Sequence, residues 1–122
     1  MGYESKLYIV DKASMFPNEE MRYCQVIAVF DLCKFYPLSC VISTYPQTDC
    51  YFYADDGNTK VLEDRYGDAL RELPIEDVID IIRNEIYSGR TYRRLYPVLA
   101  ALEVLENKQD QWNELAVLHY GY

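Results

Sequence analysis

The side chains with the widest range of chemistry are four cysteines and a single histidine: Cys24, Cys33, Cys40, Cys50 and His119. Thiolates and imidazole nitrogens are the ligands that zinc prefers in tetrahedral sites. Alternating apolar residues place Cys24 on the core side of a strand and Cys33 on the opposite side, so the four thiols cannot all meet at one ion. A zinc site of Cys33 and Cys50 with Cys40 or His119 stays within reach. The alternative is that these cysteines fill the core, where free cysteine is common.

A second cluster of metal ligands is Asp55-Asp56-Gly57-Asn58, followed by Glu63 and Asp64. Calcium prefers such oxygen ligands, but the twelve-residue loop with acids at alternate positions is missing. A tight hairpin turn explains the same residues more simply.

Catalysis has little support in the sequence. A Cys-His pair using His119 needs a thiol held beside the imidazole, which spacing alone does not indicate. The chain has no phosphate-binding glycine loop, nucleophile elbow or paired-histidine metal motif. Adjacent acids such as Glu63-Asp64 and Glu76-Asp77 are typical of solvated surface. We therefore expect a protein that is not an enzyme, with a metal-dependent hydrolase or nuclease as an alternative.

Negative charge is concentrated in one part of the chain. The formal net charge is -8 over 122 residues, and residues 49–85 hold 11 acids against 4 bases. Such a segment repels phosphate and attracts cationic protein surfaces, so we expect no direct binding of nucleic acid. The alternative is an acidic face that serves only solubility.

Tyrosines are interleaved with these acids, and the chain has 13 of them. Tyrosine supplies rigid contact area and carboxylates complement arginine and lysine, which is the composition of an interface aimed at a basic partner. The candidate partner-binding residues are Tyr51, Tyr53, Asp55, Asp56, Glu63, Asp64, Tyr66, Asp68, Glu76, Asp77 and Asp80.

These residues must be positioned by strands and turns in the first two thirds of the chain. Period-two patterns predict strands at Leu7–Val10 and Arg22–Lys34, the second with Cys24, Val26, Ala28, Phe30 and Leu32 on one side. The apolar run Cys40–Thr44 lies between two prolines and predicts a short edge strand. Cys50–Ala54 and Thr59–Glu63 flank an Asp-Gly turn and predict a β-hairpin with an exposed, acidic tip.

Helical spacing begins after Pro74, where Ile75, Val78, Ile79, Ile82 and Ile86 recur on one face and Ser88-Gly89 gives a stop. A second helix is predicted to begin between Thr91 and Pro97 and to end near Asn107. Leu115–Tyr120 predicts a final strand. Strands, then two helices, then one strand favour an α+β fold of a single domain over residues 1–122, with an antiparallel sheet of about five strands and two helices on one face.

No apolar run approaches the length of a membrane span, and the first residues lack the basic and apolar regions of a secretory signal. We therefore expect a cytoplasmic protein that does not bind membranes and whose cysteines are free thiols or metal ligands.

Several phrases spread over nearly the whole chain resemble small proteins carried by phages and prophages of Gram-positive bacteria. They are Met1–Tyr8, Phe30–Lys34, Asp49–Asn58, Glu63–Asp68 and Leu118–Tyr122. Small acidic proteins of that setting include anti-CRISPR inhibitors, and this sequence looks like one of them. The resemblance implies a phage-encoded inhibitor that binds a Cas9-type effector in the bacterial cytoplasm and blocks guide or target-DNA loading. The alternative in the same setting is a small zinc-stabilised phage protein with another interaction role.

Overall fold

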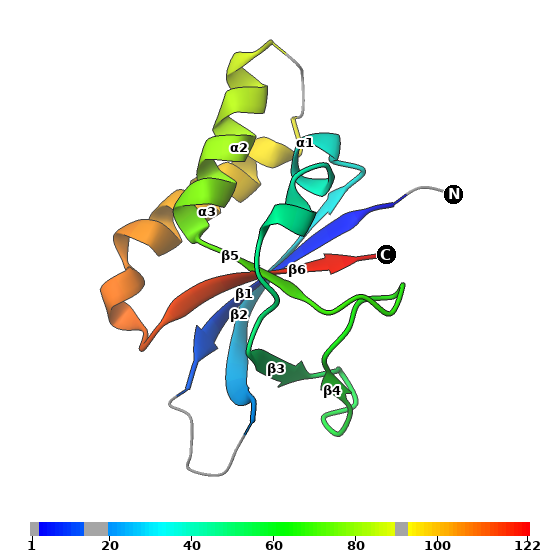
Figure 1. The fold of residues 1–122 in the computed structure, drawn as a ribbon. Helices are drawn as coiled ribbons and strands as arrows, with labels where there is room; N and C mark the ends of the chain where they lie inside the picture. The colour runs from blue at the N-terminus through cyan, green and yellow to red at the C-terminus, as the bar shows by residue number, and fades with distance from the viewer. Residues whose placement is uncertain (1–2, 14–19, 90–92) are drawn as a thin grey trace.

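Six strands form one sheet whose order is β4-β3-β2-β1-β6-β5 (Figure 1). The computed structural model describes residues 3–13, 20–89 and 93–122. The strands are β1 (Ser5–Lys12), β2 (Arg22–Cys33), β3 (Cys50–Tyr53), β4 (Lys60–Val61), β5 (Arg71–Leu73) and β6 (Leu115–Gly121). The predicted α+β class is therefore confirmed, with one more strand than expected.

The sheet is mixed rather than antiparallel. β2 and β3 run parallel, with Arg22 opposite Cys50, while the other neighbouring strands are antiparallel. The chain needs a crossover between parallel neighbours, and residues 34–49 provide one long enough. This segment carries the helix α1 (Tyr36–Ser39) and the 3₁₀ turn η1 (Ile42–Thr44).

The expected edge strand at Cys40–Thr44 is therefore wrong. Pro37 stands in the first turn of α1, where a proline fits because its missing N–H has no helical partner. The following amides bond locally, as Val41 N does to the carbonyl of Leu38 at 3.1 Å and Thr44 N to that of Val41 at 3.0 Å. The prolines mark a helical corner here instead of the ends of a strand.

Two long helices cover one face of the sheet, as predicted (Figure 1). They are α2 (Ile75–Tyr87) and α3 (Leu95–Asn107), and the 3₁₀ turn η2 (Gln109–Gln111) follows α3. Pro74 caps the start of α2, and Gly89 after its end has a φ of +88°, a conformation that favours glycine. Leu7 and Ile9 of β1 and Val117 of β6 meet the helices in this core. None of the helices in the described part of the chain is long and apolar enough to cross a membrane.

A second core lies on the other face of the sheet, under β3. It contains Cys24, Cys50, Phe52, Leu70 and Leu118. β3 pairs with β2, yet Phe52 stacks on Tyr8 of β1 with ring centroids 4.5 Å apart. The sheet must therefore curl so that β3 turns over its own concave face, away from α2 and α3.

A β-bulge divides β2 between the two cores. Ile9 pairs with Ala28 while Val10 pairs with Val26, so Ile27 has no partner of its own in β1. Cys24 and Val26 consequently face the concave core, whereas Ala28, Phe30 and Leu32 face the helices. The prediction that all five share one side is wrong, because it assumed unbroken alternation.

Candidate functional site

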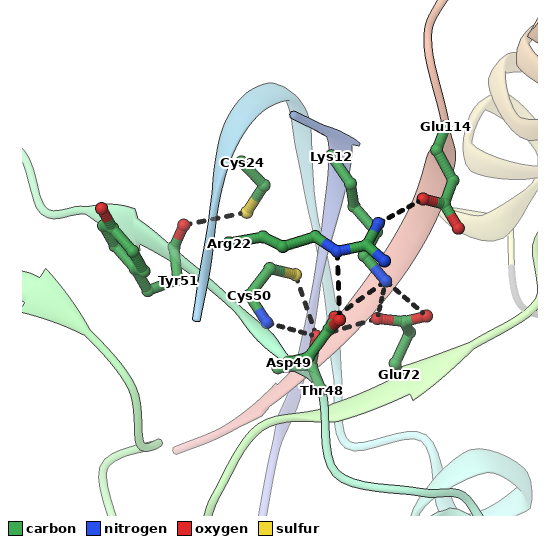
Figure 2. Close-up of polar contacts among 9 residues, drawn as sticks. All are labelled: Lys12, Arg22, Cys24, Thr48, Asp49, Cys50, Tyr51, Glu72 and Glu114. Atoms are coloured by element: carbon green, nitrogen blue, oxygen red, sulfur yellow. Dashed lines mark hydrogen bonds and ion pairs between the residues drawn. The ribbon is translucent and has the colours of Figure 1, made fainter. Parts of the chain in front are cut away.

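A cluster of charged side chains around the buried Lys12 closes the concave face where β1, β5 and the start of β3 meet (Figure 2). The ammonium of Lys12 lies 2.9 Å from Asp49 Oδ1 and 3.0 Å from Glu72 Oε1, and the lysine is only 6% exposed. Arg22 extends the network, with Nε 3.2 Å from Asp49 Oδ2 and Nη1 2.7 Å from Glu114 Oε2. Burial works to lower the pKa of Lys12, but the hydrogen bonds to Asp49 and Glu72 outweigh it and raise that pKa.

Two buried thiols lie beside this network (Figure 2). Cys24 Sγ donates to the carbonyl of Tyr51 at 3.1 Å, and Cys50 Sγ lies 2.9 Å from Thr48 Oγ1, which in turn donates to Glu72. The close approach of the two thiols, more than burial, raises the pKa of Cys24, and it lowers that of Cys50. Full burial of both residues nevertheless makes them core residues rather than accessible nucleophiles.

The structure does not bring the predicted zinc ligands together. Within the described ranges, the grouping of metal-ligating side chains that does form is Asp49, Cys50 and Glu72, whose ligand atoms lie within 4.8 Å of one another. Cys33 is half-buried and Cys40 is exposed on the α1 corner, and neither joins Cys50. Sequence alternation could not place Asp49 and Glu72 beside Cys50, because β5 and β3 meet only through the curl of the sheet. The ammonium of Lys12 occupies the position between the two carboxylates that a cation would take.

His119 belongs to a separate, buried contact. It is 3% exposed, and its Nε2 lies 2.8 Å from Ser5 Oγ, which is also fully buried. Burial lowers the pKa of His119 to about 4, so the ring is neutral at pH 7. Tyr3 stacks on this ring and on Tyr66, with centroid distances of 5.8 and 5.5 Å. The inaccessible hydroxyl of Ser5 argues for a structural role of this pair.

The hairpin tip forms as predicted and is fully open to solvent. The amide of Ala54 donates to the carbonyl of Thr59 at 2.8 Å, and Gly57 has a φ of +74°. Asp56 accepts hydrogen bonds from the Thr59 hydroxyl at 2.6 Å and from the amides of Thr59 and Asn58. These bonds lower the pKa of Asp56 to about 2 and leave Asp55 as the carboxylate of the tip that makes no turn contact among the described residues.

A second acidic turn follows β4. Asp64 Oδ1 accepts the amides of Tyr66 at 2.8 Å and Asp68 at 3.1 Å, which fixes the turn, and Glu63 pairs through its backbone with Ala69. Burial and the nearby charges of Asp64 and Asp68 raise the pKa of Tyr3 to about 12. The hairpin tip and this turn stand at the two ends of β4, so they form one acidic edge of the molecule, which we call the β4 edge (residues 55–68).

The remaining predicted acids lie elsewhere. Glu76, Asp77 and Asp80 are on α2, and Figure 1 shows α2 and β4 in different parts of the molecule. Asp77 accepts a hydrogen bond from the hydroxyl of Tyr45 at 3.0 Å, and Asp80 lies 3.9 Å from Arg83. The acidic segment therefore does not form a single surface.

The three predicted tyrosines do not form one group either. Tyr51 and Tyr53 meet Tyr23 of β2 in a cluster with centroid distances of 5.7 to 6.0 Å, and Lys60 Nζ lies 4.5 Å from the Tyr51 ring centroid. Tyr66 is 53% exposed on the second acidic turn. Sequence reasoning missed Tyr3, Tyr8 and Tyr120, which come from distant parts of the chain and meet these loops only in the fold.

No protein-family model matches the chain, and no match was found among curated proteins or solved structures.

Proposed function

We propose that this protein is a stoichiometric inhibitor that binds a bacterial protein through a cationic surface used for nucleic acid. The observation that carries the proposal is that the carboxylates at the β4 edge are not held in ion pairs with described residues. Asp55, Asp56, Glu63, Asp64 and Asp68 take part in none of the ion pairs among the described residues. With Lys60 and Arg65, residues 55–68 hold five acids and two bases, a net charge of -3.

Two other acids of the segment, Asp49 and Glu72, behave differently. Asp49 and Glu72 are neutralised by Lys12, and Arg22 adds a second cation to Asp49. Charges paired inside a protein contribute little field to its surroundings, whereas unpaired surface charges of one sign steer and orient a partner. The β4 edge, with five carboxylates outside these ion pairs, is therefore better suited to meet lysine and arginine than the Asp49 and Glu72 cluster is.

Aromatic contact area stands next to these charges. Tyr53 is 40% and Tyr66 53% exposed. Tyrosine is enriched at protein interfaces, where one ring gives contact area and its hydroxyl gives a hydrogen bond. The combination supports protein binding over a merely solvating acidic face.

The resemblance to small phage proteins suggests the identity of the partner. A Cas9-type effector holds guide RNA and target DNA in a positively charged channel. An acidic edge seated in that channel would compete with phosphate for the same lysines and arginines and so block guide or target-DNA loading. We therefore propose a Cas9-type effector as the partner.

The test is a binding measurement with purified Cas9-type effector, with and without guide RNA. Glu63→Lys with Asp68→Lys changes the net charge of the β4 edge from -3 to +1 and should weaken the complex by roughly tenfold or more. The matched control is Glu106→Lys near the end of α3 with Asp110→Lys in η2, which should change the affinity by less than about twofold. The affinity of the unmodified protein should also fall steeply with added salt.

Equal affinity for the β4-edge variant and the unmodified protein would refute the proposed surface. A third variant, Glu76→Lys with Asp80→Lys, then asks whether α2 makes the contact instead. Absence of any complex with the effector would refute the proposed partner.

A further inference from the structure

A groove with aromatic walls opens between the β3–β4 hairpin and the concave face of the sheet. Its volume is about 280 Å³. Its walls include Tyr8 of β1, Tyr120 of β6, Phe52 of β3 and Val61 of β4. The bulge at Ile27 contributes to it, because it lets both Val26 and Val29 face this side of the sheet. Val29 is 48% exposed there, so the groove is open to a partner.

The rings in the groove are held in fixed relation to one another. Tyr8 stacks on Phe52 with centroids 4.5 Å apart and meets Tyr120 edge-on at 5.9 Å. Burial, followed by the neighbouring Tyr120 and Asp55, raises the pKa of Tyr8, so its hydroxyl stays protonated. The groove therefore presents a rigid aromatic floor with a negative charge at its rim.

Of the described residues that line this groove, Asp55 is the only charged one. It is exposed and takes part in no ion pair or turn hydrogen bond that the described residues make. The neighbouring hollows differ, since one holds Lys60 above the Tyr51 ring and another holds Arg71 beside Asp64 and Asp68. Lys6 faces the same side of the sheet, but its ammonium lies 4.7 Å from the Tyr122 ring centroid. This groove thus has an anionic rim with no cation of its own.

We propose that the groove receives one arginine side chain of the protein partner, with the guanidinium at Asp55 and the aliphatic stem against Tyr8, Phe52 and Val61. This inference rests on the proposed function, because it names the anchor with which the cationic partner binds. The volume lies just below the range of about 300–1,000 Å³ for ligand pockets, which suits a single side chain rather than a free cofactor. Arginine in a central pocket is a frequent energetic hot spot of protein interfaces.

Arginine fits this groove better than lysine does. Its guanidinium is weakly hydrated, so it loses less on leaving water than an ammonium does. The Asp55 carboxylate can accept two parallel N–H groups from the planar guanidinium, a geometry that an ammonium does not offer.

The test is an NMR titration of the ¹⁵N-labelled full chain with N-acetyl-arginine methylamide. Amide shifts should saturate and should cluster at residues 8, 29, 52–55, 61 and 120. The neutral isostere N-acetyl-citrulline methylamide should bind at least about fivefold more weakly, since it keeps the shape and loses the charge. The lysine analogue should bind more weakly than the arginine one.

Two variants and a control locate the site. Asp55→Asn should weaken binding of the arginine probe by roughly fivefold or more. Val29→Arg places a guanidinium on an exposed strand position at the groove and should abolish binding while the rest of the spectrum stays folded. Asp110→Asn is an equally exposed acid far from the groove and should leave binding unchanged. Equal binding of citrulline, shifts spread over all acidic loops, or an unaffected Asp55→Asn would overturn the proposal.

The same variants separate this inference from the proposed function. A Cas9-type complex that forms with unchanged affinity for Asp55→Asn and Val29→Arg would overturn the arginine anchor and leave the inhibitor proposal standing. Saturable arginine binding in the groove without any such complex would support the anchor site and overturn the proposed partner.

Discussion

At the scale of single residues, Lys12 is a charged side chain that the fold buries between two carboxylates. Its ammonium is held by Asp49 and Glu72 while the side chain is almost wholly buried. The ammonium links β1 to β5 and to the residue before β3, so it fixes the closure of the concave face. Neither Lys12 nor Arg22 stood out in the sequence, because a lone base in a strand carries no signal of the partners that the fold brings to it.

Lys12→Met should destabilise the protein by about 2–3 kcal/mol. Removal of one partner from a buried ion pair costs about 3–5 kcal/mol, and the partial exposure of Asp49 and Glu72 reduces that value. Urea unfolding followed by circular dichroism measures the change. Lys108→Met, at an exposed position after α3, is the matched control and should change stability by less than about 0.5 kcal/mol. Equal effects of the two substitutions would contradict the structural role of Lys12.

His119 gives the protein a defined dependence on pH. Its pKa is about 4 in the fold and about 6.5 in an unfolded chain, so between these values the unfolded state binds the extra proton. The contribution of His119 to the free energy of unfolding is therefore fully present above pH 6.5. It decreases as the pH falls towards 4, by up to about 3 kcal/mol. His119→Gln should flatten the decrease between pH 7 and 5 in urea unfolding curves. An unchanged slope in this window would show that His119 is not the responsible group.

At the scale of elements, the geometry of the hairpin turn depends directly on its own residues. Gly57 has a φ of +74°, and a methyl group there would meet no atom within 4 Å. The cost of Gly57→Ala therefore comes from the backbone alone and should be about 1–2 kcal/mol. Gly57→Asn should cost less, since asparagine tolerates the left-handed region better. Thermal or urea unfolding of the two variants checks this order, and a Gly57→Ala protein as stable as the parent would contradict it.

The elements that depend on local pattern were predictable, and those that depend on chain crossing were not. Helical spacing and capping signals placed α2 and α3, and the Asp-Gly turn placed the β3–β4 hairpin. The segment at Cys40–Thr44 was misassigned because its short apolar run looks the same in a strand and in a partly exposed helical corner. The parallel pairing of β2 with β3 has no local signature, because it is decided by the path of residues 34–49.

At the scale of the whole molecule, the curl of the sheet decides which candidate residues meet. It separates the α2 acids from the β4 edge, puts Cys50 with Asp49 and Glu72, and brings Tyr8 and Tyr120 next to the hairpin. The sequence supported the acidic hairpin tip and its tyrosines as exposed features. It could not indicate the groove, whose walls come from residues 8 to 120 and depend on a one-residue bulge.

The bulge at Ile27 also constrains which substitutions this sequence can accept during evolution. The first half of β2 packs under the hairpin and the second half under the helices. Substitutions at Cys24 or Val26 should therefore be compensated in β3, and those at Ala28 or Phe30 in α2 and α3. In an alignment of relatives, a single strand would then split into two groups of coevolving positions on either side of residue 27.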